Sequence, residues 1–97
     1  MTATVTPPAG RYRIEVDASA QRDLARLPPK IATAIVEFVT GALADNPHRL
    51  SKPLRAELAS YRSARRGDYR VLVRIDDDHH VVLVVAITHR AHVYRPR

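Results

Sequence analysis

The sequence predicts a single α+β domain with the element order β-α-α-β-β-β. Residues 11–17 alternate between apolar and polar side chains, as a half-buried strand does. Residues 19–45 instead carry apolar side chains at intervals of three and four, which is the spacing of helices. Residues 61–87 return to strand-like patterns, so we expect a twisted, mainly antiparallel sheet with the helix pair on one face.

Length and composition limit the class of protein. The chain has 97 residues, the size of one domain, and we expect a disordered leader over residues 1–10 and the domain over residues 11–97. It has no cysteine, which excludes disulfides and thiolate metal sites and fits a reducing compartment. Its longest apolar run, residues 81–87, is far shorter than the roughly 20 residues that span a bilayer. We therefore expect a cytoplasmic protein without a membrane partner.

Two helices joined by a proline pair follow the first strand. Asp17 or Ser19 can cap the first helix, which ends at Pro28 and Pro29. Pro29 also suits the first position of a second helix, because the backbone N–H that proline lacks has no helical partner there. The second helix ends at the Asn-Pro-His of residues 46–48, and residues 48–60 predict a loop with one helical turn. Three leucines recur in this loop at every fourth position: Leu50, Leu54 and Leu58.

Residues 61–75 predict a β-hairpin that turns at Gly67 and Asp68. The two faces of its second strand differ in chemistry, with Tyr69, Val71, Val73 and Ile75 on one and Arg70, Leu72 and Arg74 on the other. We expect the first face to pack on the helices and the second to stay open for a ligand. After a turn over residues 76–80, residues 80–87 are apolar on both faces, as in a central strand, and a short strand near residues 92–95 closes the sheet.

Positive charge is concentrated in the second half of the chain. The net charge is +6, and residues 48–74 hold eight basic and two acidic residues, whereas residues 1–47 hold five of each. Nearly all the basic residues are arginines, whose planar guanidinium binds phosphate through two hydrogen bonds. This distribution predicts a polyanionic partner, nucleic acid in preference to a membrane, with a solubilising basic face as the alternative.

No motif for a cofactor or a metal occurs, and we expect neither. The acids and histidines of residues 76–80 fall in a predicted turn, where water solvates them. RNA can be cleaved without a metal when its 2′-hydroxyl attacks the adjacent phosphate and leaves a 2′,3′-cyclic phosphate. Such a site needs cations that stabilise the phosphorane and groups that transfer protons. Arginine is a poor base, so His89, His92 and Tyr94 are the candidates for proton transfer.

The motifs GDYRV at residues 67–71 and HR-x-x-VYR at residues 89–95 identify a family resemblance. Together with AQRDLARLPPKI at residues 20–31, they make residues 11–95 resemble the RelE branch of the RelE/ParE toxin superfamily. The resemblance implies a RelE-like fold and an mRNA endonuclease of a bacterial type II toxin–antitoxin system. Such an enzyme cuts the message in the ribosomal A site without a metal and so inhibits translation.

The resemblance also implies the site residues. It matches the catalytic positions of the family to Arg62, Arg65, Arg70, Arg90 and Tyr94. Further basic residues are expected to contact RNA or the ribosome: Lys52, Arg55, Arg66 and Arg74. Relatives carry lysines in the first hairpin strand, whereas this chain has Ala64 there. The general base therefore shifts toward Tyr94 or a histidine, and low intrinsic activity is one of the readings that stay open.

The implied partners are the ribosome, mRNA and a cognate antitoxin. An acidic or amphipathic segment of the antitoxin would cover the basic face, and operator DNA would be contacted only through the toxin–antitoxin complex. Two other functions stay open: a gyrase-inhibiting toxin of the ParE branch, and a catalytically weak corepressor retained for antitoxin binding. The terminal HR-x-x-VYR motif favours the nuclease over the gyrase inhibitor.

Overall fold

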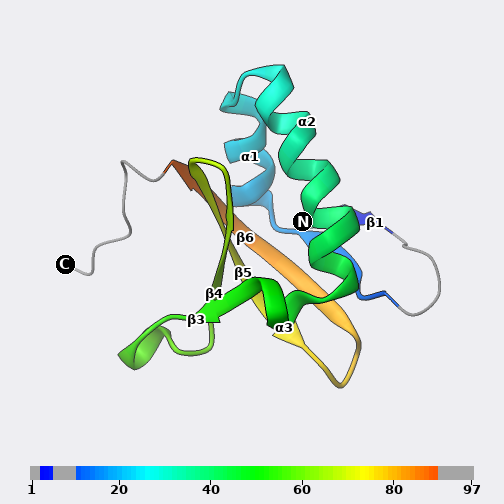
Figure 1. The fold of residues 1–97 in the computed structure, drawn as a ribbon, viewed down its shortest axis with the longest axis vertical. Coiled ribbons are helices and arrows are strands. Elements are labelled where there is room, and N and C mark those ends of the chain that lie inside the picture. Colours follow the sequence, from blue (N-terminus) through cyan, green and yellow to red (C-terminus); the bar gives the residue numbers. More distant parts are fainter. Residues whose placement is uncertain (1–2, 6–10, 90–97) are drawn as a thin grey trace.

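A computed structural model describes residues 3–5 and 11–89, with side chains over residues 11–89. It confirms the α+β class, with helices on one face of a mixed sheet (Figure 1). The strands are β1 (Ala3–Val5), β2 (Arg13–Val16), β3 (Ser51–Pro53), β4 (Arg62–Arg66), β5 (Tyr69–Asp76) and β6 (Val81–His89). Their order in the sheet is β1-β2-β6-β5-β4-β3. β2 and β6 pair in parallel, and all other neighbours are antiparallel.

The N-terminal strand is one departure from the predicted organisation. Residues 1–10 were expected to belong to no element, but β1 pairs with β2 and sets Ala3 opposite Val16. Without β1, β2 would be an edge strand with unpaired backbone groups, which an added strand satisfies. Thr4 and Val5 are β-branched and favour the extended conformation.

The first helix, α1 (Ala18–Arg26), is fixed to the central strand β6 by two hydrogen bonds. Asp17 caps it, because its carboxylate accepts a 2.7 Å hydrogen bond from the Ala18 N–H. The Ser19 hydroxyl donates to the Val85 carbonyl at 2.7 Å, and the Asp23 carboxylate accepts from the Ile87 N–H at 2.9 Å. These bonds satisfy backbone groups of β6 close to its irregular register with β5.

The second helix, α2 (Pro29–Phe38), begins at the predicted proline and continues into a π-helical turn, η1 (Val39–Leu43). With α1 it covers one face of the sheet (Figure 1). The core between these layers is made of aliphatic side chains, including Ile14, Ile35, Leu43, Val71, Val73, Val82 and Val84. Val71 and Val73 are fully buried, as their predicted orientation toward the helices requires. We call this side of the sheet the helix-covered face and the other the open face.

Residues 48–60 contain more structure than the single predicted turn. A short helix, α3 (Pro47–Leu50), leads into β3, which pairs antiparallel with β4, and a 3₁₀ turn, η2 (Ala56–Leu58), follows. β3 lies at the edge of the sheet, where Pro53 is tolerated because its missing N–H can face outward. The strand predicted near residues 92–95 lies outside the described residues. No helix among the described residues is long and apolar enough to cross a membrane.

Candidate nucleic-acid interface

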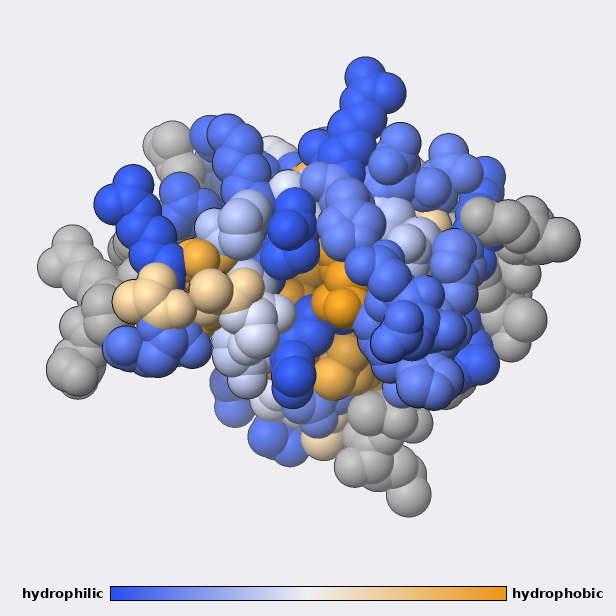
Figure 2. All heavy atoms as spheres, turned by 90° about the horizontal axis from the view of Figure 1, so that it is seen from below, coloured by the Kyte–Doolittle hydropathy of each residue, from blue (hydrophilic) through white to orange (hydrophobic). Residues whose placement is uncertain are grey.

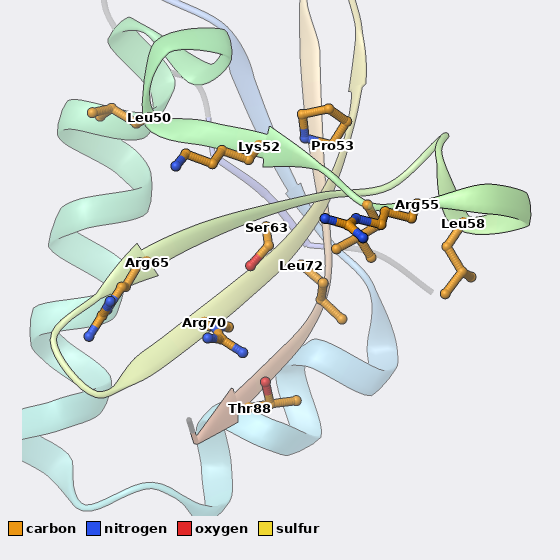
Figure 3. A pocket seen from close by; sticks show the side chains of 11 residues that line it. Leu50, Lys52, Pro53, Arg55, Leu58, Ser63, Arg65, Arg70, Leu72 and Thr88 are labelled. Carbon is orange, nitrogen blue, oxygen red and sulfur yellow. The ribbon is translucent and has the colours of Figure 1, made fainter. Parts of the chain in front are cut away.

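A groove of about 570 Å³ opens on the open face of the sheet (Figure 3). Its cations are Lys52, Arg55, Arg65 and Arg70. Its apolar lining is Leu50, Pro53, Leu54, Leu58 and Leu72. Two hydroxyl side chains, Ser63 and Thr88, complete it. We call it the basic groove, since its described residues include four cations and no acidic side chain.

Strand register brings these side chains together. Arg65 lies directly opposite Arg70 in the β4–β5 ladder, and Thr88 lies opposite Arg70 in the β5–β6 ladder. Directly opposed residues of neighbouring strands project to the same side of a sheet, so these three share the open face. Lys52 joins them from β3, where it lies opposite Ser63. The groove is thus assembled from four strands and depends on their pairing.

The turn of the hairpin fixes the register that opposes Arg65 to Arg70. Gly67 has a φ of +60°, a left-handed conformation that glycine adopts without strain. The predicted turn at Gly67 and Asp68 is confirmed. The Arg65 Nε–H also donates to the Gly67 carbonyl at 3.4 Å. Among the described residues, neither Arg65 nor Arg70 makes an ion pair, so their charge is available to a ligand.

Arg62, predicted to act beside Arg65 and Arg70, lies on the opposite side of the sheet. It pairs with Val73, whose side chain is in the core, so its own side chain leaves β4 toward the helix-covered face. There the guanidinium donates to the Ser51 hydroxyl at 2.7 Å, the Ser51 carbonyl at 2.9 Å and the His48 carbonyl at 3.2 Å. Arg62 therefore fixes the corner between α3 and β3 and does not line the basic groove.

Several other predicted residues also lie away from the groove. His89 is opposite Tyr69, with ring centroids 5.0 Å apart in an edge-to-face arrangement, on the side facing the helices. Arg66 is also opposite Tyr69 in its own ladder, next to the turn. Arg74 places its guanidinium carbon 5.5 Å from the centre of the Tyr61 ring. Arg90, His92 and Tyr94 lie outside the described residues.

A polar cluster joins α3 to the residue before β2 and to the turn between β5 and β6. Asp77 accepts a 2.6 Å hydrogen bond from the Tyr12 hydroxyl, and its carboxylate oxygens lie 2.8 and 3.0 Å from His48 Nε2. The bonds from Tyr12 and His48 hold the pKa of Asp77 below its usual value, and the same bond to Asp77 raises the pKa of Tyr12. His80 stacks on Tyr12 with centroids 3.8 Å apart. The cluster contributes nothing to the basic groove.

The surface on the lower side of the molecule in Figure 1 is mostly hydrophilic. Figure 2 views the molecule from this side, below the orientation of Figure 1, and hydrophobic surface shows there mainly in recesses between polar side chains. The described residues contain no cluster of three His, Cys, Asp or Glu side chains suited to a metal ion. Most histidines and acids of residues 76–80 instead pair with neighbours, as His79 does with Asp76 at 2.7 Å.

The apolar half of the groove was not predicted from sequence. The sequence assigns Leu50, Leu54 and Leu58 to a loop without a surface to cover, yet all three line the groove together with Leu72. The spacing was the available signal, because a leucine at every fourth position on a polar loop needs a surface to cover. Ser63 and Thr88 carried no signal of their own.

Fold and groove define the class of protein: a small basic α+β domain with one sheet face covered by helices and a cationic groove on the other. The family described as ParE toxin of type II toxin-antitoxin system, parDE, matches residues 14–94. Toxin RelE of Mycobacterium tuberculosis is 57% identical over 84 residues, which are 87% of each chain. Toxin RelG of the same organism is 51% identical over 84 residues, covering 87% of this chain and 97% of RelG.

A solved structure agrees with these sequence matches. The crystal structure of the toxin–antitoxin complex RelBE2 from Mycobacterium tuberculosis contains a chain that is 50% identical, with a TM-score of 0.80 over 82% of this chain and 99% of that one. This chain belongs to the RelE/ParE family of toxins of type II toxin–antitoxin systems.

Proposed function

We propose that the chain is a ribosome-dependent mRNA endonuclease that inhibits translation without a metal or a cofactor. The observation that carries this proposal is the cross-strand pair Arg65 and Arg70 in a groove whose described lining holds four cations and no acid. A phosphate that bridges the two guanidinium groups would accept hydrogen bonds from both. The 57% identity to Toxin RelE supports the same branch of the family.

The reaction follows from the chemistry of RNA. The 2′-hydroxyl oxygen forms a bond to phosphorus, the bond from phosphorus to the 5′-oxygen breaks, and a 2′,3′-cyclic phosphate remains. Arg65 and Arg70 stabilise the charge of the phosphorane, and Lys52 and Arg55 attract the flanking phosphates. In this proposal the C-terminal residues supply a further cation, Arg90, and the groups for proton transfer. Tyr94 or His92 would transfer the protons, which arginine cannot do.

Position 64 does not argue against activity. Relatives carry lysines in this strand, whereas this chain has Ala64. This difference is the reason for the alternative of a catalytically weak corepressor retained for antitoxin binding. Ala64 is fully buried in the core on the helix-covered face, where a lysine could not reach RNA. The cations of the basic groove come from other positions.

The partners follow from this activity. The site of action would be the cytoplasm, where the ribosome presents the message. We propose that a cognate antitoxin covers the basic groove with an acidic or amphipathic segment and carries the contacts to operator DNA. The RelBE2 relative was solved as a toxin–antitoxin complex, which supports such a partner.

Induction without the antitoxin tests the proposal. The 5′ ends of cellular mRNA are mapped after brief expression of the chain and of its Arg70→Ala variant. New ends within codons, present with the parent chain and absent with the variant, are the expected result. Intact messages in both cultures would contradict the nuclease function.

A gyrase-inhibiting toxin is the second candidate, because the matching family description is that of a ParE toxin. Such a protein needs no phosphorane-stabilising groove. Induction would then cause DNA damage while messages stay whole, so the same cultures separate the two functions.

A further inference from the structure

The basic groove has an apolar half beside its cationic half. In Figure 3, Leu72 lies between Arg70 and the loop that carries Arg55 and Leu58. Leu54 and Pro53 line the same volume. A ligand that fills the groove therefore meets the cations Arg65 and Arg70 of the hairpin and, next to them, aliphatic side chains of Leu72 and the loop, which also carries Arg55.

Leu72 extends the apolar lining of the groove onto β5. Its neighbours on β5, Val71 and Val73, belong to the core, whereas Leu72 points the other way and is still only 8% exposed. The main core does not include it. Leu54 and Leu58, from the loop over residues 53–60, line the groove together with it. The loop and Leu72 together form an apolar wall.

The loop is held in place by its own backbone. The Leu54 N–H donates to the Tyr61 carbonyl at 3.0 Å, and the Tyr61 N–H donates to the Leu58 carbonyl at 2.9 Å. Ala56 has a φ of +55°, which is uncommon for a residue with a Cβ atom. Strained backbone of this kind persists where the surroundings fix it, often at ligand sites. The wall is therefore present before a ligand arrives.

We propose that the apolar half of the basic groove binds one nucleobase of the message while Arg65 and Arg70 hold the adjacent phosphate. This inference rests on the proposed function and names the part of the substrate that the groove reads. A nucleotide combines a flat, largely apolar ring with a negative charge, which matches the two halves of the groove. Its volume of about 570 Å³ is within the range of small-ligand sites.

The polar groups of the groove fit the same ligand. Unpaired bases are bound by proteins through contact of the ring face with side chains and through hydrogen bonds to their edges. Ser63 and Thr88 provide hydroxyl groups that can donate or accept, and Thr88 lies opposite Arg70, next to the proposed phosphate position. The absence of acids among the lining residues favours a ligand with negative charge.

Two probes that differ only in the base test the inference. Adenosine 5′-monophosphate and ribose 5-phosphate are titrated into the chain, and NMR follows the leucine methyls and the arginine Nε–H groups. Both probes should shift Arg65 and Arg70, but only the nucleotide should shift Leu54, Leu58 and Leu72. Equal affinity for the two probes, with unchanged methyls, would overturn the inference.

A variant of the wall gives a second readout. Leu58→Ala should weaken binding of the nucleotide about tenfold and leave ribose 5-phosphate unchanged. Val36→Ala is the matched control, because Val36 is 43% exposed on α2, away from the groove, and should change neither affinity. If Leu58→Ala binds the nucleotide as tightly as the parent chain, the wall does not hold the base.

Mononucleotide binding requires no cleavage, so its outcome is separate from that of the proposed function. Methyl shifts that only the nucleotide causes, together with uncut cellular messages, would support the nucleobase site and contradict the proposed endonuclease function. Leucine methyls that respond to an antitoxin but not to the nucleotide would make the wall a protein-docking surface and overturn the inference.

Discussion

Arg65 and Arg70 lie directly opposite each other across the β4–β5 hairpin, and among the described residues neither guanidinium has a carboxylate partner. Like charges in this position destabilise a hairpin. The arrangement opposes folding and favours a ligand that places negative charge between the two side chains. It is the feature from which the proposed chemistry begins.

The first prediction concerns catalysis. Arg65→Ala and Arg70→Ala should each lower the rate of message cleavage by about 10²–10³-fold, because each removes a donor to the phosphorane. The measurement is cleavage of a message on purified ribosomes. Each variant should unfold at a urea midpoint no lower than that of the parent chain, which shows that it is folded. If stability is lost together with activity, the arginine belongs to the structure instead.

The second prediction concerns stability at the same positions. Arg65→Thr should raise the free energy of unfolding by about 0.2–1 kcal/mol, because it removes repulsion and threonine favours strands. Urea denaturation at low salt measures the change, and added salt should reduce it by screening. A destabilised variant would mean that Arg65 supports the hairpin.

The third prediction separates Arg62 from the groove. Arg62→Ala should lower the free energy of unfolding by about 1–3 kcal/mol, since it removes hydrogen bonds from a guanidinium to Ser51 and His48. Arg66→Ala, next to the turn, is the control and should change stability little. The quantity to compare is the urea midpoint of both variants. An Arg62→Ala chain of normal stability that no longer cuts would return Arg62 to the catalytic set.

The fourth prediction concerns acid. The pKa of Asp77 is lowered in the folded chain by hydrogen bonds from Tyr12 and His48, so its ionised form stabilises the fold at any pH above its ordinary value of 3.8. That stability is lost as the pH falls from this value through the lowered folded pKa. Asp77→Asn should therefore make the urea midpoint less dependent on pH below about 4, compared with Asp78→Asn. If the urea midpoints of both variants depend on pH in the same way below about 4, the hydrogen bonds of Asp77 do not stabilise the fold.

The fifth prediction concerns Lys52. Lys52→Arg should keep most of the cleavage activity and Lys52→Gln should lose about tenfold, because the proposed role of this residue is its charge. Cleavage rates on programmed ribosomes distinguish the two variants. An arginine variant as inactive as the glutamine variant would show that a removable proton is needed, and Lys52 would then be the base.

The hairpin and its two faces were predictable because alternation and turn chemistry are local. Val71 and Arg70 fall on the sides that their chemistry requires. The position of Arg62 also follows from the sequence. Counted outward from the turn at Gly67, Arg62 pairs with Val73, so its side chain leaves the strand on the side of the core. The expectation that Arg62 acts beside Arg70 rests on the resemblance to the family alone.

Other features depend on contacts that local patterns do not contain. The hydrogen bond between Tyr12 and Asp77 joins residues 65 positions apart. β3 has only three residues, one of them a proline, and forms because β4 presents a free edge. The apolar wall combines Leu72 of β5 with leucines of a loop that is distant in the sequence. The spacing of these leucines indicates that they cover a surface but not which surface.

Cleavage of a defined message on purified ribosomes tests the central claim most directly. A labelled mRNA is positioned with a known codon in the A site and incubated with the parent chain or with Arg70→Ala. The account predicts a single cut in that codon by the parent chain only, a 2′,3′-cyclic phosphate on the upstream fragment, and no cut without ribosomes. An uncut message on the ribosome, or a cut that Arg70→Ala makes equally well, would contradict it.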